Sequence, residues 1–244
     1  MIVIPMVGNG SRFVDAGFVN YKYEIIILDQ PLFVHVVNSF KKYFLTEHFL
    51  FIRNSQHNNE DFIRSKISEL GILKYTVINL EGMTRGQAET VSLGLESLTS
   101  YVDEHLLIFN IDTIRPGFEF PRELSFFPWV ETFRHAGNHW SFVKPFPNTN
   151  NVSEIVEKVR ISDLCCTGAY YFPKISEFLE IFKSHYSEFD GIEMFVAPMF
   201  ESYLKEGIQV KFRTVEQEKI FLCGTPEEYH SLNLLSLKEL AQET

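Results

Sequence analysis

Two hydrophobic patterns alternate along the first 111 residues, and this alternation limits the possible folds more than any other feature. Short apolar runs typical of buried strands lie at residues 2–6, 24–28, 49–52, 75–80 and 106–111. Between these runs, apolar residues recur at spacings of three and four, as in amphipathic helices, at 33–43, 62–70 and 88–98. Strands that alternate with helices predict right-handed crossovers and a sheet covered on both faces. We therefore expect an α/β fold, a single-domain Rossmann-like α/β/α sandwich with a mostly parallel central sheet.

Length and composition favour one domain with a large core. The chain has 244 residues, of which 45% are hydrophobic, enough for one core and short for two full domains. No apolar run approaches the roughly 18 residues of a membrane-spanning helix, and the amino terminus lacks the pattern of a secretion signal. We expect a cytoplasmic protein with no membrane partner.

Charge and cysteine content narrow the function classes further. A net charge of −10 argues against a nucleic-acid partner, because binding a polyphosphate backbone normally needs a broad basic face. Any anionic ligand must then be held by a small local cluster of basic side chains. The three cysteines, two of which are the neighbours Cys165 and Cys166, match neither a disulfide framework nor a metal pattern, so we expect reduced thiols in or near the core.

The hydrophobic pattern changes after Asp112. Five of the ten prolines lie within residues 114–151, where the periodicity weakens, so we expect an irregular insertion that walls a cleft. Helices are predicted at 175–186 and 193–205. Thr225-Pro226-Glu227-Glu228 has the residues of a capping box and predicts the start of a last helix.

A glycine-rich turn, Gly8-Asn9-Gly10-Ser11-Arg12, follows the first apolar run. Glycines let backbone amides approach an anion, so a strand that enters such a turn is a common phosphate site. A dinucleotide fingerprint would need a glycine in place of Phe13, and the Gly-Lys-Ser/Thr of a P-loop does not occur in the sequence. Arg12 and Lys22 could converge on one polyphosphate; the alternative is that both are ordinary surface charges.

Two further segments carry polar residues next to predicted strands and helices. Gln87 precedes the helix at 88–98 and could recognise a base edge with its paired donor and acceptor, or could simply be a polar cap residue. Asp112 ends an apolar strand, where ligands collect in open parallel sheets, and could hold Mg²⁺. The alternative for Asp112 is an Asx turn at the strand end.

Weaker signals lie in the second half of the chain. Lys158, after Glu157, could bind a second phosphate, and Gly168 could leave room for a substrate against the backbone. Glu193 could accept hydrogen bonds from hydroxyls or an amine.

The order of these motifs resembles that of the sugar-phosphate nucleotidylyltransferases over nearly the full length. The segments that carry the resemblance are GNGSRF, AGFVNYKYE, GQAETV, NID, EK, TGAYYF, IEMFVAPMF and CGTPEEY. Within that superfamily, KYE, PLFVHVVNSF, IFNIDT, HWSF and EKVRISDLCCTGAYYF look most like a capsule-associated subgroup. Some members of this subgroup are cytidylyltransferases for phosphorylated precursors, including phosphoglutamine.

The resemblance implies a role for each matching residue. It implies a nucleotide-binding half over 1–113 and an acceptor-binding half over 114–244. Catalytic roles fall on Arg12 for the leaving pyrophosphate, Lys22 for the α-phosphate and Asp112 for Mg²⁺. The implied nucleotide-binding residues are Met6, Val7, Gly8, Asn9, Gly10, Ser11 and Gln87. The implied acceptor-binding residues are Glu157, Lys158, Gly168 and Glu193.

Three positions depart from the superfamily pattern. Tyr21 replaces a proline before the signature lysine, and Asp29 replaces a turn glycine. Cys223 stands where sugar-specific members often have a second metal aspartate, so Mg²⁺ would rest on Asp112 and the nucleotide phosphates.

The expected function is a Mg²⁺-dependent transfer of a nucleoside monophosphate, CMP from CTP in the favoured case, to a small phosphorylated acceptor in capsule precursor synthesis. One alternative is a UTP- or TTP-dependent pyrophosphorylase for a hexose 1-phosphate. The other is a non-catalytic nucleotide-binding regulatory module, since a fold does not establish an activity. A homodimer is possible, because 24 phenylalanines leave scope for an apolar interface.

Overall fold

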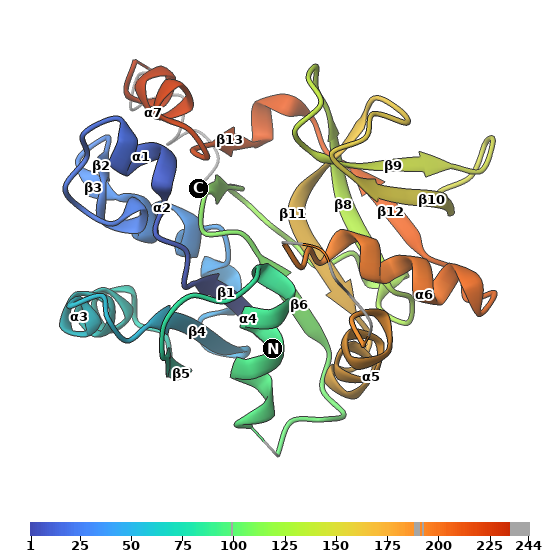
Figure 1. Ribbon diagram of the computed structural model, residues 1–244, viewed down its shortest axis with the longest axis horizontal. Coiled ribbons are helices and arrows are strands. Elements are labelled where there is room, and N and C mark those ends of the chain that lie inside the picture. Colours follow the sequence, from blue (N-terminus) through green and yellow to red (C-terminus); the bar gives the residue numbers. More distant parts are fainter. Residues whose placement is uncertain (99, 188–190, 192, 235–244) are drawn as a thin grey trace.

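A computed structural model describes residues 1–98, 100–187, 191 and 193–234, and Figure 1 shows their arrangement. Five strands form the first part of the central sheet: β1 Ile2–Met6, β4 His48–Asn54, β5 Lys74–Leu80, β6 Leu106–Phe109 and β11 Leu164–Phe172. The first four are parallel, in the order β5–β4–β1–β6. The sheet then continues through β11, which is antiparallel to β6.

The second half of the chain extends the same sheet. The remaining strands are β8 Trp129–Arg134, β9 Ser141–Pro145, β10 Val152–Glu157 and β12 Lys211–Thr214. Strand β11 pairs with both β8 and β9 in antiparallel fashion, β10 continues from β9, and β12 lies parallel to β8. The sheet is therefore mixed: β5, β4, β1 and β6 are parallel, β12 is parallel to β8, and the other pairs are antiparallel.

Helices cover both faces of the sheet (Figure 1), and the fold class expected from the sequence is confirmed. One core includes α2 Leu32–Asn38 and α3 Glu60–Leu70, and the other includes α4 Gln87–Glu96, α5 Ile175–His185 and α6 Phe200–Lys205. Strand β1 serves both cores, because Ile2 and Ile4 pack in the first and Val3 in the second. None of the helices in the described ranges is long and apolar enough to cross a membrane.

The strand expected at 24–28 is wrong. The chain forms a 3-10 turn, Lys22–Glu24, and then a small antiparallel hairpin of β2 Ile26–Ile27 and β3 Gln30–Pro31 outside the central sheet. Its turn is left-handed, with φ of 47° at Leu28 and 71° at Asp29. Aspartate tolerates this backbone region better than most residues, which accounts for Asp29 at a position where the superfamily resemblance implies a glycine.

The segment at 114–151 is not the irregular insertion expected, since it contains β8 and β9, but part of it, residues 139–141, does line a cleft. The prolines lie between the strands or at their ends: Pro128 precedes β8 and Pro145 is the last residue of β9. Proline removes a ladder donor but is tolerated at strand ends, so a high proline content did not mean missing structure. The first residue of this segment, Ile114, belongs to β7 Thr113–Ile114, which pairs with β13 Phe221–Leu222.

Two helix predictions need shorter bounds. The helix expected at 33–43 ends at Asn38 and is followed by a 3-10 turn, Lys41–Tyr43. In place of one helix over 193–205, the chain is irregular at 193–196, turns at Ala197–Met199 and becomes α6 at Phe200, since Pro198 cannot lie in a helix interior. The helix at 175–186 is confirmed as α5, and the predicted capping box opens α7 Pro226–Asn233.

Candidate active site

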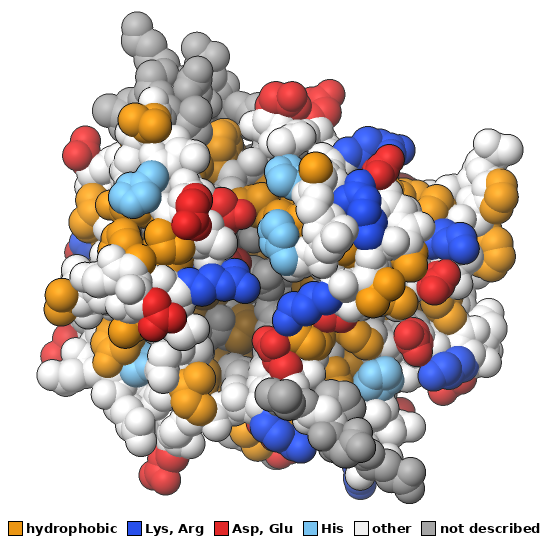
Figure 2. Space-filling model, turned by 45° about the horizontal axis from the view of Figure 1, so that its top comes forward, with side chains coloured by type: hydrophobic (Ala, Val, Ile, Leu, Met, Phe, Trp, Pro, Cys, Tyr) orange, Lys and Arg blue, Asp and Glu red, His pale blue; other side chains and the backbone are white. Residues whose placement is uncertain are grey.

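A cleft of about 630 Å³ opens at the carboxyl ends of β1 and β6. Figure 2 shows this face hollowed near its middle, with side chains of both charges at the rim. The cleft brings together residues from both halves of the chain. The predicted residues that line it are Met6, Val7, Gly8, Gly10, Arg12, Lys22, Gln87, Asp112, Glu157 and Glu193. Asn9, Ser11, Lys158 and Gly168 are described but lie beside the cleft rather than in its lining.

The glycine-rich turn leads from β1 into α1 Ser11–Asp15. Gly10 has a φ of 62°, and a Cβ atom there would lie 3.3 Å from the Cβ of Lys22. A glycine at this position therefore serves both the left-handed backbone and the close approach of the lysine segment. Arg12 on α1 and Lys22 both face the cleft, as the hypothesis of convergence requires.

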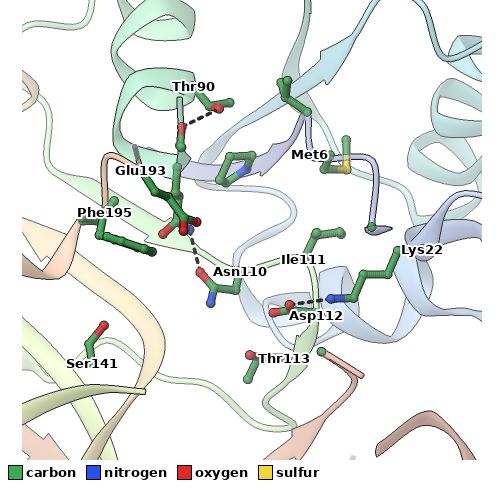
Figure 3. A pocket seen from close by; sticks show the side chains of 18 of the residues that line it. Met6, Lys22, Thr90, Asn110, Ile111, Asp112, Thr113, Ser141, Glu193 and Phe195 are labelled. Atoms are coloured by element: carbon green, nitrogen blue, oxygen red, sulfur yellow. Dashed lines mark hydrogen bonds and ion pairs between the residues drawn. The ribbon is translucent and has the colours of Figure 1, made fainter. Parts of the chain in front are cut away.

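Lys22 and Asp112 form an ion pair across the floor of the cleft (Figure 3). The Nζ of Lys22 donates to the Oδ2 of Asp112 at 2.6 Å, although the residues are 90 positions apart. Asp112 follows β6, and its carbonyl accepts a hydrogen bond from the Cys223 amide at 2.8 Å. Cys223, the residue directly after β13, thus helps to hold Asp112 in place.

Gln87 at the start of α4 donates from Nε2 to the Oδ1 of Asn110 at 2.6 Å. Gly168 makes room for Asn110, because a Cβ on Gly168 would lie 2.5 Å from the Cγ of Asn110. The sequence singled out Gly168 as space for a substrate, but the structure fills that space with Asn110. Asn110 belongs to the NID segment, and nothing local in the sequence indicates that its side chain joins Gln87 to Gly168.

Two carboxylates line the other wall of the cleft. Glu157 ends β10 and accepts a hydrogen bond from Ser141 of β9, and burial raises the pKa of its carboxyl. Glu193 points into the cleft beside Phe195 (Figure 3). The Nζ of Lys158 lies at the rim, 3.2 Å from the Oε2 of Glu193 and 4.3 Å from the centre of the Phe195 ring.

Ser141 and Trp140 are cleft residues to which the sequence analysis assigned no individual role. Trp140 lines the cleft and also packs edge-on against Phe133, with ring centres 5.3 Å apart. Trp140 therefore has a packing role as well as a place at the site. Ser141 carried no signal, since only the pairing of β9 with β10 places its hydroxyl next to Glu157.

The residues at the cleft floor fit a magnesium ion held partly by a nucleotide. Asp112 supplies one carboxylate, and Mg²⁺ in proteins is commonly held by one or two carboxylates together with substrate phosphates. Among the described residues, no group of three or more His, Cys, Asp or Glu side chains gathers into a self-contained metal site. Cys223 is no substitute for a second aspartate, because burial raises the pKa of its thiol to about 12.

The cleft combines three groups: the glycine-rich turn after β1, the Gln87 amide at the start of α4 and the Asp112 carboxylate after β6. Together they form the site of a nucleotide-binding α/β protein. Comparison with solved structures gives the family. A nucleoside-diphosphate-sugar pyrophosphorylase from Vibrio cholerae RC9 is 37% identical, with a TM-score of 0.91, over 96% of this chain and 100% of that chain. The chain therefore belongs to the sugar-phosphate nucleotidylyltransferase superfamily, enzymes that transfer a nucleoside monophosphate to a sugar or another phosphorylated acceptor.

More distant structures share the fold. A putative glucose-1-phosphate thymidylyltransferase from Bacillus anthracis is 18% identical, with a TM-score of 0.75 over 98% of each chain. An inositol-1-phosphate CTP transferase from T. maritima is 14% identical, with a TM-score of 0.73 over 95% of this chain and 94% of that chain. No protein-family model and no curated protein matches the sequence.

Proposed function

We propose that the protein transfers CMP from CTP to a small phosphorylated acceptor and releases pyrophosphate. The observation that carries this proposal is the Lys22–Asp112 pair, which lies between the glycine turn on one side and the Glu157 and Glu193 wall on the other. CTP as the donor, and an activated capsule precursor as the product, are supported by the segments shared with the capsule-associated subgroup.

The reaction needs positioning and charge neutralisation rather than a general base. An acceptor phosphate oxygen, already anionic at neutral pH, attacks the α-phosphorus, the new P–O bond forms, and the bond to pyrophosphate breaks. In this scheme Arg12 holds the leaving pyrophosphate and Lys22 contacts the α-phosphate. Lys158 leaves Glu193 at the rim to meet the acceptor phosphate.

The charges in the cleft support a requirement for a divalent cation. Basic side chains in the lining do not outnumber acidic ones, because the acidic Asp112, Glu157, Glu193 and Glu228 face the basic Arg12, Lys22 and Arg85. A triphosphate placed there would meet too little positive charge from the protein alone. Asp112 would hold Mg²⁺, and the bound ion would neutralise phosphate charge.

The test is pyrophosphate release by the purified protein with Mg²⁺. CTP, UTP, TTP, ATP and GTP are each paired with phosphorylated sugars, polyols, choline and glutamine. The proposal expects release with CTP and one class of acceptor, loss of release in Lys22→Ala, and loss of release when a chelator removes the metal. Pyrophosphate release with another triphosphate, and none with CTP, would overturn the CTP assignment.

A second candidate keeps the reaction and changes the substrates to UTP or TTP and a hexose 1-phosphate. The observation in its favour is the 37% identical V. cholerae structure, which is described as a nucleoside-diphosphate-sugar pyrophosphorylase. Gln87 does not decide between the two, because a side-chain amide can present either polarity to a base. A regulatory module is the outcome if CTP binds and no pair in the panel releases pyrophosphate.

A further inference from the structure

A hydrogen-bonded chain of buried polar side chains lies behind the glycine-rich turn, and none of these side chains has a role in the proposed reaction. Its members are Arg53, Asn59, Tyr23 and His57, and each side chain is at most 6% exposed. Arg53 Nε donates to Asn59 Oδ1 at 3.2 Å, and Asn59 Nδ2 donates to the Tyr23 hydroxyl at 2.7 Å. The chain continues through His57 Nδ1, 3.1 Å from that hydroxyl, and its Nε2, 3.0 Å from the Oδ1 of Asn9.

The direction of every bond in this chain follows from its first member. A guanidinium only donates, so Asn59 must present Oδ1 to Arg53 and Nδ2 to Tyr23. The Tyr23 hydroxyl accepts from Asn59 and therefore gives its own proton to His57 Nδ1. His57 is then the neutral tautomer with its hydrogen on Nε2, and it donates to Asn9.

Both titratable members keep the required forms at neutral pH. Burial, with the nearby Arg53 charge, lowers the pKa of His57, which favours the neutral ring. Burial raises the pKa of Tyr23 to about 12, so its hydroxyl keeps its proton. Arg53 is anchored in turn by Asn79 Oδ1 at 2.7 Å and Glu60 Oε2 at 3.3 Å.

The last hydrogen bond of this series, from His57 to Asn9, decides which polar atom of the Asn9 side chain is available to a ligand. Asn9 is exposed and lies between Gly8 and Gly10 in the turn. Because its Oδ1 accepts from His57, the other polar atom of its side chain is the Nδ2 amide, a double donor with the polarity that phosphate oxygens need.

His57 also supports the segment that carries Lys22. The ring of Tyr21 stacks on the ring of His57, with centres 3.8 Å apart and planes 22° from parallel. His57 is buried and held by hydrogen bonds at both ring nitrogens, so stacking on its ring supports the backbone just before Lys22.

We propose that His57 is a positioning residue for the phosphate site, turning the Asn9 amide nitrogen toward the nucleotide phosphates and bracing the Lys22 segment through Tyr21. This inference rests on the proposed nucleotide site, and it adds Asn9 Nδ2 as a phosphate donor. No catalytic step is assigned to His57, which acts through Asn9 and Tyr21.

The test is binding of inorganic pyrophosphate and of CTP, each measured by calorimetry in magnesium buffer, so that catalysis is not needed. His57→Phe keeps a ring for Tyr21 and loses both hydrogen bonds, and we expect roughly tenfold weaker binding of each ligand. His57→Gln can still donate to Asn9 and should restore most of the affinity. The matched control is His48→Phe, which removes the bond of His48 Nε2 to Thr76 Oγ1, 2.9 Å long, at the other end of β4, and should bind both ligands normally.

A double-mutant cycle separates positioning from general destabilisation. Asn9→Ala changes an exposed turn residue and should lose about as much affinity as His57→Phe, while the double variant should lose little more than either. Normal pyrophosphate affinity in a folded His57→Phe or in Asn9→Ala, or additive losses in the double variant, would overturn the inference.

The two proposals fail in different ways. A wild-type protein that binds CTP but never releases pyrophosphate contradicts the proposed function and leaves the role of His57 intact. A wild-type protein that binds neither ligand overturns the phosphate site and, with it, this inference.

Discussion

Gly168 and Asn110 lie so close together that a Cβ atom on Gly168 would fall 2.5 Å from both Cγ and Nδ2 of Asn110. Gly168 also has a φ of 94° and lies in a register shift of β11, between Cys166 and Tyr170. The irregular backbone of β11 therefore makes the space in which Asn110 meets Gln87. Gly168, which was assigned to the acceptor site, thus makes room for the residue that contacts Gln87 in the nucleotide site.

Gly168→Ala should therefore destabilise the protein by about 2 to 4 kcal/mol and weaken nucleotide binding, because strain and a clash act together. Urea unfolding measures the first effect and calorimetry with CTP the second. Gly71→Ala is the matched control: Gly71 has a φ of 74° with no atom near its missing Cβ, so strain alone should cost about 1 kcal/mol. If Gly168→Ala and Gly71→Ala lowered the free energy of unfolding equally, the steric argument would be contradicted.

Lys22→Ala should lower the rate of pyrophosphate release roughly a hundredfold to a thousandfold, in line with the loss of one transition-state donor. Single-turnover kinetics measures this step directly. Lys66→Ala removes another partly exposed lysine from an ion pair, with Glu69 at 2.7 Å on α3, and should leave the rate unchanged. A folded Lys22→Ala that retains the wild-type rate would remove Lys22 from the mechanism.

Asp112→Asn should raise the Mg²⁺ concentration needed for half-maximal activity, because an amide oxygen lacks the charge of the carboxylate ligand. Titration of activity with MgCl₂ at fixed CTP gives the shift. Asp112→Asn also weakens the pair with Lys22, so Lys22→Gln serves as the comparison that leaves the carboxylate in place. The metal assignment fails if Asp112→Asn keeps the wild-type Mg²⁺ dependence, or if Lys22→Gln shifts that dependence by as much.

Glu47 should make stability depend on pH in the acid range. A hydrogen bond from His105 lowers the pKa of Glu47 from 4.5 to about 2. The folded protein thus prefers the carboxylate, so the stabilisation is complete above pH 4.5 and is lost as the pH falls toward 2. Allowing for solvent screening, Glu47→Gln should cost about 1 to 2 kcal/mol at pH 7.

Urea unfolding of the Glu47→Gln variant between pH 2 and 7 measures this dependence. The difference from wild type should shrink steadily below pH 4.5. Glu154→Gln, which alters the exposed pair of Glu154 with Lys144 at 3.6 Å, should follow the wild-type curve. A Glu47→Gln difference that stays constant down to pH 2 would rule out the linkage.

Local sequence predicted the features that depend on neighbouring residues. The spacing of apolar residues identified β1, β4, β5, β6, α3 and α4, and Thr225 with Glu228 marked the start of α7. The predicted thiols are confirmed too, because Cys165, Cys166 and Cys223 are buried and unpaired within the described chain. These features follow from short-range geometry: side chains one turn apart share a helix face, and alternate side chains share a strand face.

Only the tertiary structure decided which of the candidate residues meet. Lys22 reaches Asp112 because β1 and β6 are neighbours in the sheet, and Asn9 reaches His57 because β1 is also a neighbour of β4. Gly168 meets Asn110 for the same reason, since β11 pairs with β6. The sequence pattern predicted β1, β4 and β6 as strands, but it did not predict β11. Their order depends on how all the apolar faces are buried together, and spacing along the chain does not encode that order.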